Sequence, residues 1–110
     1  GHLEFTYSAS ADQALHFAFD APVGKPFGFF CGSPAAIGLV MADLAVKSAP
    51  VDIIRYMTPD KGTSHSNEVI VAVTGEASAV KSAVLTARDV GLKLLVSMGS
   101  YPETPSKPYL

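Results

Sequence analysis

The residues of this sequence that could do chemistry lie mostly in one polar loop, "TPDKGTSHSNEV", which runs from Thr58 to Val69. Ser64 and His65 are neighbours there, and nucleophilic enzymes pair these types because an imidazole can take the proton of an attacking hydroxyl. In an extended loop, however, adjacent side chains point to opposite sides, and no acid is placed to orient the imidazole. The chain is therefore not predicted to be an enzyme.

The rest of the loop offers hydroxyl and amide groups but little charge. One interpretation is a solvated hairpin tip with no further role. Another is a pore-lining or ligand-binding segment, because several copies around a symmetry axis would enclose a small polar opening. The second interpretation accounts for the length of the loop, since two residues are enough to join two strands. Gly62 permits an unusual turn, and hydroxyl or amide groups are offered by Thr63, Ser64, Ser66 and Asn67.

Metal and cofactor sites are not predicted. His2, His16 and His65 fall in separate elements, without the ligand spacing of a zinc site. The stretch "GSPAAIG" opens a helix, where free amides attract anions. It lacks the lysine and the glycine pattern of nucleotide-binding loops, so a plain strand-to-helix turn is preferred. Cys31 ends an apolar strand and is expected to be a buried, unreactive thiol.

The composition favours a protein that contacts other protein. Of the 110 residues, 48% are hydrophobic and 16% are charged, against about 25% charged in an average soluble domain. The net charge of −2 argues against a nucleic-acid binder. No apolar run reaches the roughly 18 residues of a membrane span, the first residues do not resemble a signal peptide, and one cysteine suits a reducing compartment. We expect a cytoplasmic protein.

The elements that position the loop follow from the apolar periodicity. Strands are predicted near residues 3–8, 27–32, 51–57 and 68–75, and helices near 11–21, 33–49 and 77–98. Ser33 is expected to cap the second helix, with Pro34 in its first position. The predicted buried stripe of the last helix is Val80, Val84, Ala87, Gly91, Leu94 and Met98. This order predicts an α+β fold with helices on one face of the sheet, followed by a proline-rich tail over residues 100–110.

The predicted helix over residues 33–49 is apolar around nearly its whole circumference. A helix of this kind must be buried on nearly all sides, which a small domain cannot do alone, so part of it is expected to lie at a subunit contact. Asp43 and Lys47 are four residues apart and can pair along the helix. The alternative, that Lys47 reaches a neighbouring subunit, is equally compatible with the sequence.

Three stretches resemble the shell domains of bacterial microcompartments: "GSPAAIGLVMADLAVKSAPVDIIRYM", the loop "TPDKGTSHSNEV", and "VTGEASAVKSAVLTARDVGLKLL". The leading stretch, "GHLEFTYSASADQALHFAFDAPVGKPFGFFCGSPA", is similar to the second half of the circularly permuted, tandem-domain shell proteins of the propanediol-utilisation type. The resemblance covers the whole chain, including its tail.

The resemblance implies a circularly permuted, ferredoxin-like BMC domain over residues 1–99, with an antiparallel sheet. It also implies a non-enzymatic shell protein of the bacterial cytoplasm, without cofactors, that assembles with itself and other shell proteins into pseudo-hexagonal tiles. Pores in such tiles pass small polar metabolites, such as polyols and aldehydes, to encapsulated enzymes. Lys47 matches the edge lysine of the family, with Asp43 beside it at the assembly edge, and Thr58 to Asn67 occupy the position of its pore loop. The resemblance implies that the pore or ligand residues are Lys61, Gly62, Thr63, Ser64, His65, Ser66 and Asn67.

A different class of function stays open beside this one. A ferredoxin-like sheet can also form a small-ligand-binding regulatory module, usually a dimer, with the loop as its effector site. Shape separates the two functions, because shell proteins form hexagonal rings and sheets whereas regulatory modules stop at dimers or compact oligomers.

Overall fold

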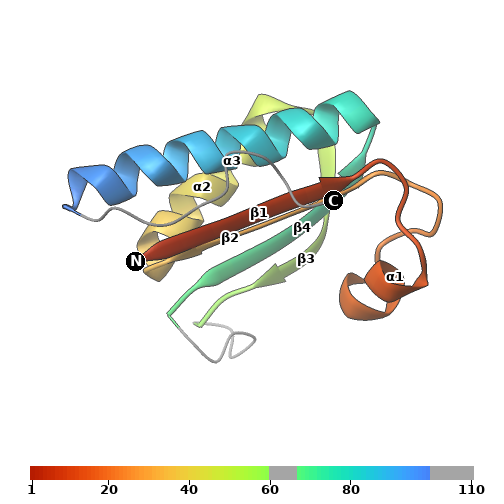
Figure 1. Ribbon diagram of the computed structural model, residues 1–110, viewed down its shortest axis with the longest axis horizontal. Helices are drawn as coiled ribbons and strands as arrows, with labels where there is room; N and C mark the ends of the chain where they lie inside the picture. The colour runs from red at the N-terminus through yellow and green to blue at the C-terminus, as the bar shows by residue number, and fades with distance from the viewer. Residues whose placement is uncertain (60–66, 100–110) are drawn as a thin grey trace.

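The computed structural model describes residues 1–59 and 67–99, which form four strands and three helices (Figure 1). In chain order these are β1 (His2–Ser8), α1 (Gln13–Phe19), β2 (Phe27–Ser33), α2 (Ala35–Ser48), β3 (Val51–Met57), β4 (Val69–Gly75) and α3 (Ala77–Ser97). The predicted order of elements is confirmed. None of the helices in the described ranges is long and apolar enough to cross a membrane.

The strands form one antiparallel sheet in the order β1-β2-β4-β3. The two central strands are the most apolar, as expected of strands with both faces covered, and the predicted α+β class is confirmed. β3 is an edge strand with a register irregularity between Ile53 and Arg55.

The two long helices, α2 and α3, cover one face of the sheet (Figure 1), and the main core lies between these layers. Its largest fully buried side chains on the strands are Leu3, Phe5, Phe30, Val69, Val71 and Val73. They alternate along their strands with residues on the other face, since successive side chains of a strand point to opposite sides.

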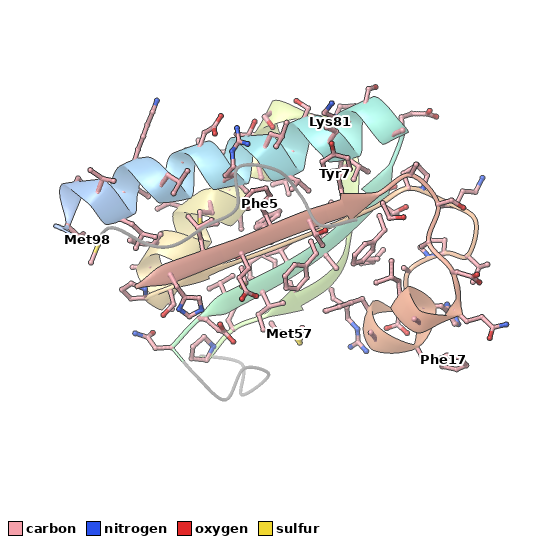
Figure 2. All side chains as sticks on the ribbon, in the orientation of Figure 1. Phe5, Tyr7, Phe17, Met57, Lys81 and Met98 are labelled. Atoms are coloured by element: carbon pink, nitrogen blue, oxygen red, sulfur yellow. The ribbon has the colours of Figure 1, made fainter. Side chains whose placement is uncertain are left out.

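The predicted stripe of α3 is correct except in its last turn. Val80, Val84, Ala87 and Gly91 are buried, but Leu95 is buried after them instead of Leu94, which is half-buried. Met98 is 59% exposed at the end of α3 (Figure 2). The reason lies in the tertiary packing, because Leu95 lies against the start of β1: a Cβ atom on Gly1 would lie only 2.6 Å from its Cδ2 atom.

The short helix α1 is an exception to the predicted placement of the helices on one face. It packs at one end of the opposite face (Figure 1), where Leu15 and Phe19 contact a small second core that includes Phe27 and Ala72. Between α1 and the sheet lies an apolar pocket of about 260 Å³. Phe17 points away from the sheet and is 81% exposed (Figure 2).

Glycine residues allow α2 to approach the sheet closely. A Cβ atom on Gly38 of α2 would lie 2.6 Å from the Cβ atom of Val69 and 2.8 Å from the carbonyl oxygen of Gly32. Met41, one turn further along α2, occupies the space that side chains on Gly32 and Gly91 would need. Both long helices can therefore lie this close to the sheet only because these three positions are glycines.

We expect Gly38→Ala to destabilise the chain by about 1–2 kcal/mol. Alanine favours a helix by about 1 kcal/mol over glycine, but forcing a methyl group into a packed contact costs about 1–3 kcal/mol or more, and part of the obstructing surface is backbone. Urea unfolding measures the difference. The control is Ser82→Thr, which adds a methyl group at an exposed position of α3. A Gly38→Ala variant as stable as the starting chain would contradict the close contact.

Candidate functional site

A pocket of about 290 Å³ lies where the predicted pore loop joins the two strands that carry it. We call it the loop-base pocket, and its lining residues come from α2, from the end of β3 and from both sides of the loop: Ala35, Leu39, Tyr56, Thr58, Pro59, Asn67 and Val69. The first turns of α2 thus form one wall, and the strands form the other.

The loop-base pocket combines an apolar wall with a few hydrogen-bonding groups. Burial, and then the carboxylate of Asp43, raise the pKa of the Tyr56 phenol, so this hydroxyl keeps its proton and can donate. Thr58 contributes a buried hydroxyl and Asn67 a carboxamide. Uncharged donors and acceptors over an apolar surface suit a small molecule that carries hydroxyl groups.

Asn67 also caps helix α2. Its side-chain oxygen Oδ1 accepts a hydrogen bond of 3.2 Å from the backbone N–H of Ala35. The prediction that Ser33 caps this helix is wrong, because Ser33 is the last residue of β2 and the N-cap residue is Pro34, which makes no side-chain cap. The free amide that suggested an anion site is thus occupied by a residue from the loop, 32 positions away.

Most of the predicted pore residues, Lys61 to Ser66, lie outside the described residues, and only Asn67 among them is placed. The pore-lining role and the possible pairing of Ser64 with His65 therefore stay predictions. Asn67 itself is exposed and lines the loop-base pocket, two residues before the start of β4.

The predicted assembly-edge residues form an ion pair within α2. The ammonium Nζ of Lys47 lies 2.7 Å from Oδ2 of Asp43, and both side chains are more than half exposed. Exposed pairs of this kind stabilise a chain by less than about 1 kcal/mol. Both groups therefore remain available to a neighbouring molecule, and the edge role stays a prediction.

The structure also assembles a cluster that the sequence did not indicate. His2 was predicted to be an isolated histidine, but one potential ligand atom each of His2, Cys31 and Glu68 lie within 4.8 Å of one another. Cys31 is 4% exposed, which confirms that its thiol is buried. Burial and the neighbouring carboxylates of Glu4 and Glu68 raise its pKa from 9.0 to about 12.

The chain is similar to known proteins in both sequence and structure. Residues 27–104 match the family described as BMC domain. The bacterial microcompartment shell protein PduB of Salmonella typhimurium (strain LT2) is 44% identical over 110 residues, which is 100% of this chain and 41% of that protein.

Two crystal structures match the fold closely. EtuB from Clostridium kluyveri has a TM-score of 0.90 at 39% identity, over 98% of this chain and 48% of that one. A trimeric bacterial microcompartment shell protein PduB has a TM-score of 0.90 at 44% identity, over 100% of this chain and 48% of that one. The chain thus spans somewhat less than half the length of these relatives.

Replacing the distant cap should destabilise the chain measurably. We expect Asn67→Ala to lower the free energy of unfolding by about 0.5–2 kcal/mol, the usual cost of losing a cap. Asn67→Asp is the matched control, because it keeps an oxygen acceptor and adds a negative charge that the start of a helix favours. Equal stability of Asn67→Ala and the starting chain in urea unfolding would show that the bond contributes nothing.

The buried thiol should make stability depend on alkaline pH. From pH 9 upward the unfolded chain ionises Cys31, whereas the folded chain keeps the proton up to about pH 12. Between pH 9 and about pH 12 the unfolded state then binds fewer protons than the folded state. The free energy of unfolding is therefore unaffected by Cys31 below pH 9 and falls as the pH rises through this range. We expect the starting chain to lose up to about 1.4 kcal/mol per pH unit more than Cys31→Ala. Parallel stability curves of the two proteins in urea unfolding would contradict this.

Proposed function

This chain belongs to the BMC domain family, and on that premise we propose that it is a structural component of a bacterial microcompartment shell. It assembles with copies of itself and with other shell proteins, and it catalyses no reaction. It lies in the bacterial cytoplasm, in a shell around encapsulated enzymes. We take residues 1–99 as one permuted domain and residues 100–110 as its tail; the family match begins at residue 27, so β1 and α1 precede the matched region.

The observation that carries the proposal is the apolar surface left exposed on α2. Leu39, Val40 and Leu44 are between 40% and 46% exposed, although the opposite side of the same helix is buried on the sheet. Ile53 on the edge strand β3 is 45% exposed as well. Exposed apolar groups that gather on one element mark a surface for another protein, and a shell protein meets other protein on several sides.

The charged end of α2 suits the edge of such a tile. Lys47 and Asp43 lie one turn apart near the end of α2, beside the exposed Leu44. In our proposal Lys47 exchanges its weak partner within the helix for groups on the next tile. The exchange costs little because both side chains are solvated in the free chain.

The loop between β3 and β4 is proposed to line a pore, with Lys61, Gly62, Thr63, Ser64, His65, Ser66 and Asn67 as its residues. The permeant class that fits best is a small uncharged polyol or aldehyde. The loop-base pocket supports this, because the uncharged polar residues Tyr56, Thr58 and Asn67 line it together with apolar residues. Such a surface can replace the water molecules around a hydroxyl without demanding a charge.

Assembly can be tested by the mass of the native particle, measured by light scattering behind a sizing column. We expect a ring of six copies, because six single domains can occupy the places of three tandem pairs. Leu44→Glu should lower the mass while circular dichroism stays unchanged, since it buries a charge at the proposed contact. Ser82→Glu, at an exposed position of α3, is the control for added charge.

The other outcomes of this measurement are equally informative. A dimer would favour the small-ligand regulatory module. A monomer would contradict assembly of this chain by itself. If the Leu44→Glu variant has the same particle mass as the starting chain, the exposed side of α2 does not form the contact between copies.

A further inference from the structure

A group of potential metal ligands lies on the face of the sheet opposite α2 and α3. We call His2, Cys31 and Glu68 the sheet-face cluster. An imidazole nitrogen, the thiol sulfur and a carboxylate oxygen lie within 4.8 Å of one another, and Nε2 of His2 is 3.6 Å from Oε2 of Glu68. In a tetrahedral zinc site, ligand atoms are about 3.3–3.6 Å apart, as bond lengths of about 2.0–2.3 Å require. Small side-chain rotations therefore bring the three atoms to ligand distance.

The sheet register explains why these residues meet. β1 and β4 begin at the same end of the sheet, on either side of the end of β2 (Figure 1). Each member of the cluster is next to a core residue that faces the helices, namely Leu3, Phe30 or Val69. Because side chains alternate along a strand, the cluster members share the other face. β1 and β2 thus contribute one ligand each, and the third, Glu68, lies directly before β4.

We propose that the sheet-face cluster binds a divalent cation of the zinc type, with His2, Cys31 and Glu68 as three ligands and a water molecule as the fourth. Imidazole and thiolate select such borderline-soft metals over magnesium and calcium, which prefer oxygen. Access to the site is open, since the side chains of His2 and Glu68 are 55% and 22% exposed. Cys31 lies beneath them and is 4% exposed.

The charges around the thiol favour a cation. The carboxylates of Glu4 and Glu68 lie near Cys31 and oppose formation of its thiolate. A bound divalent cation would offset both carboxylates and bind the sulfur as thiolate, with the thiol proton released to solvent. A mere surface pair of His2 with Glu68 would require no thiolate. The state of the sulfur therefore distinguishes a metal site from an ordinary polar contact.

The test is a titration of the folded chain with Co²⁺, the spectroscopic substitute for Zn²⁺. We expect a thiolate-to-cobalt charge-transfer band in the near ultraviolet and the visible bands of a tetrahedral site, both lost when Zn²⁺ is added. Cys31→Ser should abolish the charge-transfer band. His2→Gln and Glu68→Gln should weaken binding more than about tenfold, because loss of even an outer-shell partner costs that much.

Matched controls separate the cluster from unspecific binding. His16→Gln removes a histidine from α1, and Glu76→Gln removes a carboxylate just beyond the other end of β4. Both should bind Co²⁺ as the starting chain does. His2 is exposed, so His2→Gln keeps the test valid if Cys31→Ser fails to fold. All three ligands belong to one chain, so the result is independent of shell assembly.

Two results would overturn the proposal. One is a folded starting chain that shows no thiolate-to-cobalt band at any point of the titration. The other is cobalt binding that His2→Gln and Glu68→Gln leave unchanged, which would place the metal elsewhere on the chain.

Discussion

The close contact between α2 and the sheet is the constraint on which the rest of the structure depends. Gly38 lies directly on Gly32 and Val69, and Met41 fills the space between Gly32 and Gly91 of α3. Since interiors are packed like crystals, this contact fixes the position of α2 and, through Met41, that of α3. It also leaves α2 with only one buried side. The apolar residues on its other side cannot turn inward, so the exposed surface that we assign to assembly follows from the packing of the core.

Much of the fold could be predicted because the strands and long helices carry strong local periodicity. The alternation in β1, the apolar run of β4 and the first four members of the α3 stripe all rest on side chains within one element. The predictions that were wrong concern contacts between elements. Leu95 is buried because of the start of β1, α1 crosses to the second face because a separate small core lies there, and α2 is capped from the loop. No rule of spacing within a segment contains this information.

The candidate sites also differ in whether they lie within one element or between elements. The pairing of Asp43 with Lys47 was one of two possibilities that the sequence left open, because residues four apart on a helix are neighbours, and the structure contains this pair. The sheet-face cluster was missed because its members lie in β1, in β2 and directly before β4, which are neighbours only in the sheet order β1-β2-β4 and not in the order of the chain. The single signal in the sequence was that each residue precedes or follows a strongly apolar strand position. That signal places a residue on a face of the sheet without identifying its neighbours there.

The bond from Ala35 to Asn67 also has a consequence for the order of folding. The first turn of α2 donates the Ala35 N–H hydrogen bond to a residue 32 positions later. During synthesis on the ribosome, this turn cannot be completed until the loop and the start of β4 have emerged. Formation of this cap bond therefore requires closure of a long segment, which is slower than local helix growth. The cap of α2 is thus a long-range contact, whereas the rest of the helix depends on hydrogen bonds within the segment.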